Sequence, residues 1–175
     1  MIRVPQGRHN PTVCVPRHGR HEPRDFSVGF MAHTHISNLL HCVFSTKERR
    51  NLIPDPTKLC RYLTGVAKGK GILLLAAGGT ANHLHVLISL RASMPVAQAM
   101  RELKGNTSRW LNETGVRFAW QEGYAAFSVS YSQREAVADY IANQAEHHRK
   151  WSFEQEFLTL LKKSGVEYDP RFVLG

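Results

Sequence analysis

The sequence lacks the features that mark several classes of protein. Its 175 residues contain three cysteines, at positions 14, 42 and 60, and no CxxC pair. This excludes a disulfide scaffold, and the apolar runs around Cys42 and Cys60 predict reduced, buried thiols. No apolar stretch reaches the roughly 18 to 20 residues that cross a bilayer, and no secretory signal pattern opens the chain. We therefore expect a cytoplasmic protein without membrane spans.

Acidic residues are also scarce. The chain has 14 Asp and Glu against 23 Lys and Arg, a formal net charge of +9. Apolar residues make up 42% of the chain, which is typical of a globular domain and too much for a disordered basic coat. The positive excess indicates a polyanionic partner, although solubility alone explains such an excess in many basic chains.

The first thirty residues differ from the rest of the chain. They hold four of the eight prolines and show neither helical nor strand periodicity, which predicts disorder. Patterned sequence begins at Met31, so a natural start there would make residues 1–30 a non-native extension. We expect one folded domain over residues 31–175. Because the segment holds five arginines and two acidic residues, the domain keeps +6 of the charge.

Apolar periodicity predicts four strands and four helices. The strands are expected at 39–46, 72–77, 83–90 and 125–131, with residues 78–82 as a hairpin turn. The helices are expected after Asp55, from Pro95, from a capping box at Ser132 to His148, and after a capping box at Ser152. The order βαββαβ predicts a ferredoxin-like α+β fold. The first two helices would cover one face of an antiparallel sheet, and the C-terminal helices would carry Tyr140.

Two histidines share one face of the third strand. Leu84, Val86 and Ile88 form its other face, so a period of two residues projects His83 and His85 to the same side. Imidazoles about 6 to 7 Å apart along a strand are able to share a divalent ion. The alternative is a pair of surface or hydrogen-bonded histidines with no metal.

Tyr140 and Gln144 lie four residues apart and so share one face of a predicted helix, outside its apolar stripe. A tyrosine hydroxyl is a potential nucleophile, and a glutamine oxygen is a neutral ligand suited to Mg²⁺ or Mn²⁺. A half-buried tyrosine beside a solvated glutamine fits the spacing as well. His147 and His148 follow one turn later, with phosphate binding or proton transfer as possible supporting roles, or no role at all.

Five segments, at 41–50, 82–88, 103–112, 120–130 and 140–148, stand in the order of a known family. From residue 31 to about residue 168, the chain resembles the single-tyrosine HUH transposases of the insertion sequence 200/605 group. Their relatives associated with repetitive palindromes are included in that resemblance. The family pattern does not include residues 1–30, which puts the start codon in doubt.

The resemblance implies a metal-dependent enzyme that cuts and rejoins single-stranded DNA. His83 and His85 would hold Mg²⁺ or Mn²⁺ with Gln144 as third ligand, and Tyr140 would attack the phosphate to form a 5′-phosphotyrosine. It also implies a homodimer joined at a sheet edge, in which the tyrosine helix of one subunit is able to complete its partner's site.

The partner that the resemblance implies is DNA with hairpins. Five basic residues become candidate DNA contacts: Lys47, Arg49, Arg50, Lys104 and Arg109. Two alternatives stay open. One is a domesticated protein that binds hairpins without cutting, and the other is a relaxase or replication initiator with the same chemistry. Proteins of the second kind are usually longer and carry a further histidine or a second domain.

Overall fold

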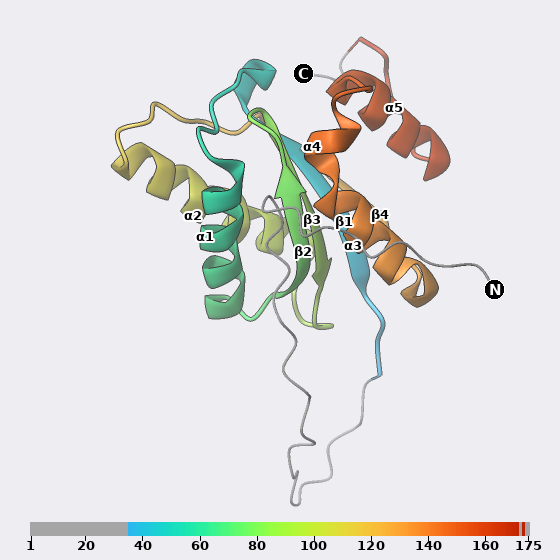
Figure 1. The fold of residues 1–175 in the computed structure, drawn as a ribbon. Coiled ribbons are helices and arrows are strands. Elements are labelled where there is room, and N and C mark those ends of the chain that lie inside the picture. The colour runs from blue at the N-terminus through green and yellow to red at the C-terminus, as the bar shows by residue number, and fades with distance from the viewer. Residues whose placement is uncertain (1–34, 172, 174–175) are drawn as a thin grey trace, which may run out of the picture.

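A computed structural model describes residues 35–171 and 173 of the chain, so the predictions for residues 1–30 and for Met31 lie outside the described residues. The described chain forms four strands and five α-helices (Figure 1). In order these are β1 (Leu39–Ser45), α1 (Pro56–Gly69), β2 (Leu73–Gly79), β3 (His83–Ser89), α2 (Val96–Glu113), β4 (Ala125–Ser128), α3 (Arg134–Ala142), α4 (Gln144–His147) and α5 (Phe153–Lys163). None of the helices in this part of the chain has the length and apolar character needed to cross a membrane.

The four strands form one antiparallel sheet in the order β2-β3-β1-β4. The α+β class, the antiparallel sheet and the βαββαβ order of elements are confirmed. β3 and β1 are central, and their register places His85 opposite Val43 and His83 opposite Ser45. The histidine-bearing strand therefore lies inside the sheet, where both of its faces are covered.

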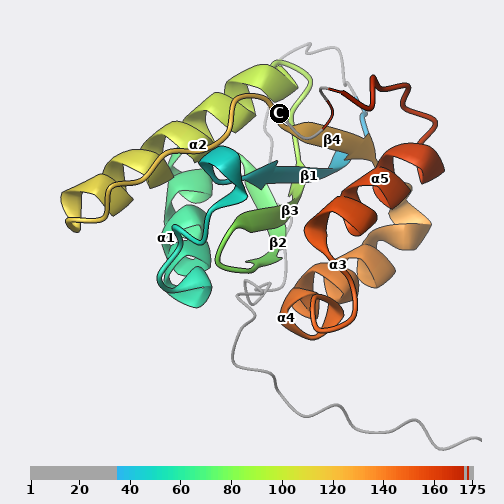
Figure 2. The ribbon, with the colours of Figure 1, turned by 90° about the horizontal axis from the view of Figure 1, so that it is seen from above.

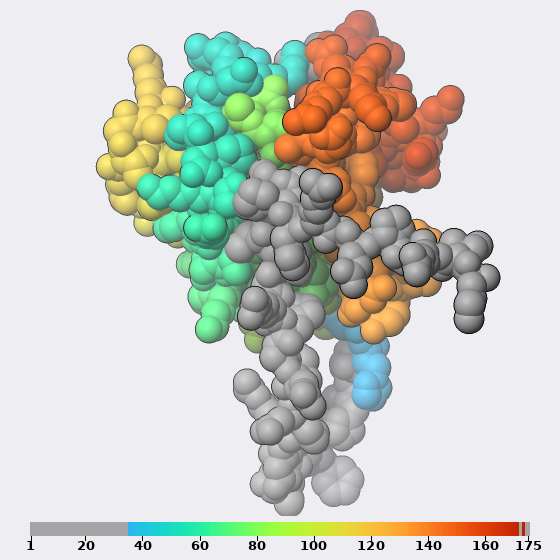
Figure 3. Space-filling view, viewed as in Figure 1, coloured from blue at the N-terminus to red at the C-terminus, as the bar shows by residue number. Residues whose placement is uncertain are grey.

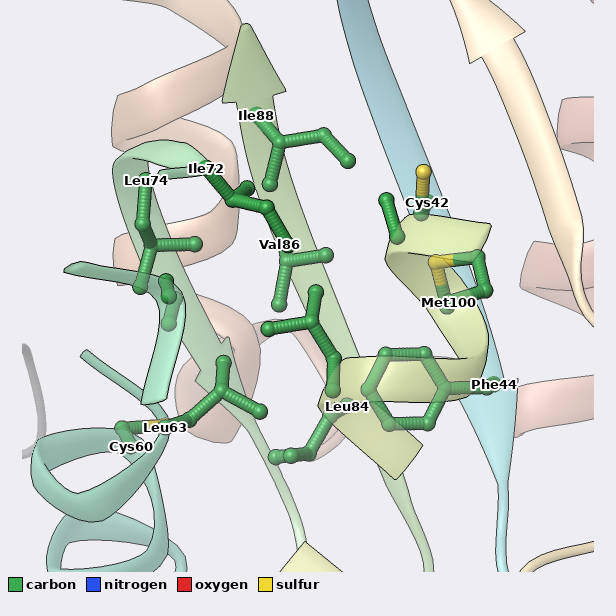
Figure 4. Close-up of a cluster of buried hydrophobic side chains, with 14 of the residues drawn as sticks. Cys42, Phe44, Cys60, Leu63, Ile72, Leu74, Leu84, Val86, Ile88 and Met100 are labelled. Atoms are coloured by element: carbon green, nitrogen blue, oxygen red, sulfur yellow. The ribbon is translucent and has the colours of Figure 1, made fainter. Parts of the chain in front are cut away.

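The first face of the sheet packs against α1 and α2, as predicted. Leu84, Val86 and Ile88 of β3 meet Leu63 of α1 and Met100 of α2 in the main apolar core (Figure 4). Each of these side chains is almost fully removed from water, which contributes roughly 1.5 to 3 kcal/mol per large apolar side chain.

Cys42 and Cys60 lie in the same core as free thiols, which confirms the prediction of reduced, buried cysteines. Burial raises the pKa of the Cys42 thiol to about 12, so this cysteine stays protonated at neutral pH.

The C-terminal helices cover the second face of the sheet. Ile141 of α3 packs on Ala76 of β2 and Leu87 of β3, whereas Leu161 of α5 packs on Val43 and Phe127 of the β1–β4 side. Seen from above, the sheet separates α1 and α2 from α3, α4 and α5 (Figure 2). In the space-filling view, a green patch of the β2–β3 region is visible between α1 and the α3–α4 segment (Figure 3).

The helix predicted from Ser132 to His148 is broken. Asn143 has non-helical backbone angles (φ −100°, ψ 19°), and its side-chain amide donates to the Asp139 carbonyl at 2.8 Å. The predicted capping box at Ser132 is wrong, because that hydroxyl contacts Ser130 at 3.0 Å and α3 begins without a side-chain cap. The helix therefore divides into α3 and the short α4.

Two other helix starts are confirmed. Asp55 accepts a hydrogen bond from the Lys58 backbone at 2.9 Å, with proline at the first helical position. Ser152 and Gln155 form the predicted capping box of α5, at 3.2 Å and 3.0 Å.

Two strand boundaries differ from the predictions by more than one residue. The fourth strand ends at Ser128, and Tyr131 is 69% exposed rather than inward, with the Arg134 guanidinium 5.0 Å from its ring centre.

Gly78 and Gly79 belong to β2 rather than to the hairpin turn. At Gly78 an added Cβ would overlap the carbonyl oxygen of Ile141, so glycine permits α3 to approach the strand closely.

Replacing Gly78 is expected to weaken the docking of α3. Gly78→Ala should lower the free energy of unfolding by roughly 1 to 3 kcal/mol in urea denaturation, because the new methyl group meets backbone that has no room to yield. The control is Gly65→Ala in α1, where nothing lies within 4 Å of an added Cβ. That change should raise the free energy of unfolding by about 0.5 to 1 kcal/mol. Equal stability of Gly78→Ala and the wild-type protein would contradict this account of the packing.

Candidate active site

His83 and His85 lie side by side on the second face of β3, as the strand period predicts. Both side chains are buried, and their ring centroids are 5.1 Å apart. The Nε2 atom of each ring is buried and has no hydrogen-bond partner. Two lone-pair donors without partners in a buried space are suited to a metal ion.

Contacts of the other ring nitrogen, Nδ1, orient both imidazoles. Nδ1 of His83 lies 2.7 Å from Oδ1 of Asn82 and 3.0 Å from the Thr80 hydroxyl, and Nδ1 of His85 lies 2.9 Å from Nε2 of His41. Since Asn82 offers an acceptor, Nδ1 of His83 carries the proton and Nε2 carries the lone pair. Metal-binding histidines are oriented in this way.

His41 is a site residue that the sequence reasoning did not single out. It lies on the central strand β1, and its odd position places it on the same face as Val43, which the strand period would have shown. Burial, and then the neighbouring His85 imidazole, lower the pKa of His41 to about 3. Burial and His85 also hold the pKa of His83 well below its usual range. His41 and His83 are therefore neutral at physiological pH, and neutral imidazole is the form that ligates metals.

Tyr140 and Gln144 come together in the site although the helix breaks between them. Tyr140 donates its hydroxyl hydrogen bond to Glu156, and Gln144 Nε2 donates to Oε1 of the same carboxylate at 3.0 Å. Gln144 is buried, and its Oε1 has no hydrogen-bond partner. The Gln144 amide therefore points its nitrogen at the Glu156 carboxylate, and its oxygen has no hydrogen-bond partner.

Glu156 of α5 is the centre of the cluster, and the sequence reasoning missed it. The side chain is 3% exposed. Besides Tyr140 and Gln144, four imidazole Nε2 atoms face its carboxylate, those of His148 at 3.0 Å, His85 at 3.3 Å, His147 at 3.5 Å and His83 at 3.8 Å. A signal was present, because Glu156 lies three residues after Phe153 and four before Leu160, within the apolar stripe of an amphipathic helix.

The carboxylate of Glu156 is ionised. Burial alone would raise its pKa, but the contacts with His148 and His85, followed by Tyr140, hold that pKa well below the usual range. Burial and the Glu156 carboxylate raise the pKa of Tyr140, so the hydroxyl keeps its proton. Despite burial, the hydrogen bond to Glu156 raises the pKa of His148. The site therefore contains one negative charge, the Glu156 carboxylate, surrounded by histidine side chains.

These donors fit a divalent cation. One ligand atom from each of His83, His85, His148 and Glu156 lies within 4.8 Å of the others. Gln144 donates to the same carboxylate through its amide nitrogen, and its amide oxygen is buried without a hydrogen-bond partner. Imidazole nitrogen combined with amide and carboxylate oxygen is suited to Mn²⁺ and related divalent ions.

Solvent reaches the site through a pocket of about 260 Å³. Its lining is Tyr140, His147, Trp151, Glu156, Thr159, Leu160 and Lys163. The Trp151 ring stacks on His147 with centroids 5.9 Å apart and planes at 14°. A substrate would therefore meet the tyrosine and the carboxylate beside an exposed aromatic ring and a lysine.

The basic turn after β1 lies at the histidine end of the sheet. The Thr46 backbone N–H donates to the carbonyl of Asn82, the residue before His83, at 2.8 Å. Lys47 and Arg50 line a pocket of about 690 Å³ together with Leu52, Asn112, Arg117, Phe118 and Ala119. Arg49 lies 3.8 Å from Glu154 of α5.

Lys104 and Arg109 are not brought to the histidines. Both belong to α2, on the other face of the sheet. The Lys104 ammonium donates to the carbonyl oxygens of Gln121, at 2.8 Å, and of Gly123, so it holds the loop before β4. Arg109 is exposed on the helix surface.

The family model described as "Transposase IS200 like" matches residues 35–144 of the chain. The chain belongs to the IS200-like transposase family. It is 28% identical over 129 residues to the transposases for insertion sequence element IS200 of Salmonella typhimurium and Salmonella typhi, covering 68% of this chain and 84% of each relative. The family match includes His83, His85, Tyr140 and Gln144, and ends before α5 and Glu156.

Two solved structures share the fold of this IS200-like transposase. A candidate transposase from Deinococcus radiodurans R1 has a TM-score of 0.52 and 20% identity, covering 67% of this chain and 98% of that one. A REP-associated tyrosine transposase bound to a REP hairpin has a TM-score of 0.52 and 15% identity, covering 71% and 76%. At these identities the likeness shows the fold alone.

Divalent metal is expected to stabilise this transposase through the two histidines. Mn²⁺ at 100 times its Kd should raise the free energy of unfolding by about 2.7 kcal/mol, because only the folded chain assembles the donors. The His83→Ala/His85→Ala variant should lose this gain in thermal or urea unfolding, whereas the exposed His35→Ala control should keep it. An unchanged gain in the double variant would place the ion elsewhere.

Proposed function

We propose that this IS200-like transposase cuts and rejoins single-stranded DNA through a covalent bond to Tyr140, with a divalent metal ion. The observation that carries the proposal is the meeting of Tyr140 with the His83–His85 pair around one carboxylate within a single chain. A nucleophile beside a cluster of unpartnered metal donors is the arrangement that metal-assisted phosphoryl transfer requires.

In the proposed cleavage step, the Tyr140 oxygen attacks the phosphorus of the scissile phosphate. A bond forms between the tyrosine oxygen and phosphorus, and the bond from phosphorus to the 3′ oxygen breaks, leaving a 5′-phosphotyrosine and a 3′-hydroxyl. The tyrosine proton passes to Glu156, which already accepts the hydroxyl hydrogen bond, and the leaving 3′ oxygen takes up a proton. Attack by a different 3′-hydroxyl reverses the step and joins strands without ATP.

His83, His85 and Gln144 would hold the ion, with Mg²⁺ or Mn²⁺ as the proposed species. When bound, the ion supplies a positive charge that polarises the phosphate and stabilises the charge developing on it. The chain's own part is to keep Tyr140 beside that position. Burial, and then the Glu156 carboxylate, raise the pKa of Tyr140, so the hydroxyl keeps its proton until the attack and depends on its hydrogen-bond partner to take it up.

Hairpin DNA is the proposed partner. The relative that is bound to a REP hairpin supports this, as does the net charge of +9. Lys47 and Arg50 border a pocket that opens at the histidine end of the sheet, next to Arg117. Trp151 offers an exposed ring on which a base would stack, with Lys163 in the same pocket for a phosphate.

We also propose that the protein acts as a homodimer. β2 and β4 are the edge strands of the sheet, and an edge strand is able to pair with a second copy. Dimerisation is not needed to bring the tyrosine to the histidines, because one chain already joins Tyr140 to the cluster through Glu156.

Removing the Tyr140 hydroxyl is expected to abolish the covalent adduct and to leave DNA binding unchanged. The substrate is a single-stranded hairpin oligonucleotide labelled at its 3′ end, because a 5′-phosphotyrosine retains the 3′ fragment. With Mn²⁺, wild-type protein should give a labelled band on a denaturing gel and Tyr140→Phe should give none. Both should bind the hairpin equally in fluorescence anisotropy.

The matched control is Tyr131→Phe, at the exposed tyrosine before α3, which should form the adduct normally. An undiminished adduct from Tyr140→Phe would refute the assignment of the nucleophile. Hairpin binding by the wild-type protein without any adduct, in Mg²⁺ and in Mn²⁺, would instead identify a binding protein that does not cut.

Neutralising the turn after β1 is expected to weaken DNA binding. Lys47→Ala/Arg50→Ala should make the dependence of log K on log salt shallower by about 1.4 to 1.8, the value for two lost phosphate contacts. The control is Arg61→Ala/Lys68→Ala on the exposed side of α1, which removes the same charge. Equal slopes for the two double variants would show that only net charge matters.

A further inference from the structure

We infer that Glu156 supplies a carboxylate ligand to the divalent ion, so that α5 completes a site of two imidazoles, an amide oxygen and a carboxylate. The inference deepens the proposed function, because it rests on the same ion at His83, His85 and Gln144. It adds a ligand from a helix that lies beyond the family match, which ends at residue 144.

The Glu156–His85 distance is one that two ligands of a shared ion would have, and the Glu156–His83 distance is somewhat longer. Oε2 of Glu156 lies 3.3 Å from Nε2 of His85 and 3.8 Å from Nε2 of His83. Two ligands that each lie about 2.1 Å from an ion, at angles between octahedral and tetrahedral, are roughly 3.0 to 3.4 Å apart. Neither of the two imidazole nitrogens forms a hydrogen bond, although both are buried beside a carboxylate. One cation bound between them would accept the lone pairs of the carboxylate and of both imidazoles.

The charge of the cluster points to the same conclusion. Four histidine Nε2 atoms lie between 3.0 and 3.8 Å from the oxygens of the Glu156 carboxylate. A buried carboxylate is costly unless a cation or several hydrogen bonds compensate it. A divalent ion beside Oε2 would add a positive charge to the three hydrogen bonds that Glu156 accepts from Tyr140, Gln144 and His148.

The second oxygen of Glu156 organises the other two functional groups. Oε1 accepts hydrogen bonds from the Tyr140 hydroxyl and from Gln144 Nε2. Because the amide nitrogen of Gln144 is held there, its oxygen is left free for the ion. One carboxylate thus ties the nucleophile and the third ligand to the ion, with Oε2 toward the histidines and Oε1 toward α3 and α4.

The helix that carries Glu156 is firmly placed. The capping box of Ser152 and Gln155 fixes the start of α5 at Phe153, three residues before Glu156. Phe153, Phe157 and Leu161 pack on the β1–β4 side of the sheet, which turns Glu156 toward the histidines. Glu154, two residues earlier, is 53% exposed and contacts Arg49, so it provides a control carboxylate on the same helix.

Isothermal titration calorimetry with Mn²⁺, in the absence of DNA, tests the inference. Glu156→Gln keeps the shape of the side chain and removes its charge, and its Kd for Mn²⁺ should be weaker by about tenfold or more. Glu154→Gln should bind Mn²⁺ as the wild-type protein does. A Glu156→Gln variant that binds Mn²⁺ as tightly as the wild-type protein, or more tightly, would overturn the inference.

A second measurement does not depend on the folding of a variant. In a crystal of the wild-type protein soaked with Mn²⁺, the anomalous peak should lie within about 2.3 Å of a Glu156 oxygen as well as of the His83 and His85 nitrogens. A peak at the histidines with Glu156 turned away would overturn the inference.

The adduct assay separates this inference from the proposed function. If Glu156 binds the ion and the wild-type protein forms no adduct, the cleavage proposal fails and the ligand assignment stands. If the adduct forms and Glu156→Gln binds Mn²⁺ normally, the ligand assignment fails and the cleavage proposal stands.

Discussion

Covering both faces of the sheet removes water from the polar side chains on its second face, so these groups must satisfy one another. A buried polar group without a partner costs about 1 to 3 kcal/mol, which is a large share of the stability of a single domain. His41 therefore pairs with His85, and Asn82 pairs with His83. Glu156 accepts hydrogen bonds from Tyr140, Gln144 and His148, and the Nε2 atoms of His83 and His85 stay without hydrogen-bond partners.

The parts of the site that depend on local periodicity were predictable from the sequence. A strand alternates its side chains, so His83 and His85 had to share a face once β3 was recognised. Local rules also explain the caps at Asp55 and Ser152, because capping is decided within four residues. The resemblance then directed attention to Tyr140, whose helix alone gave no reason to prefer it to an ordinary half-buried tyrosine.

The parts that depend on contacts between distant residues were not predictable in the same way. His41 is 44 residues from His85, and Glu156 is 16 residues from Tyr140. Gly78 reads as a turn residue until α3 is seen to need the space above it. Lys104 shows the converse, because its charge suggested a DNA contact, whereas in the fold its ammonium holds the loop before β4.

The break at Asn143 divides the residues of the site between α3 and the segment that runs from α4 to α5. On one side, Tyr140 belongs to a helix that Ile141 anchors against Gly78. On the other side, Gln144 begins a short helical turn that leads to α5 and Glu156. Helix geometry alone does not fix Tyr140 relative to Gln144 across this break. Their relative position depends instead on the hydrogen bonds that both donate to Glu156, so a side chain of α5 replaces the continuity that the helix has lost.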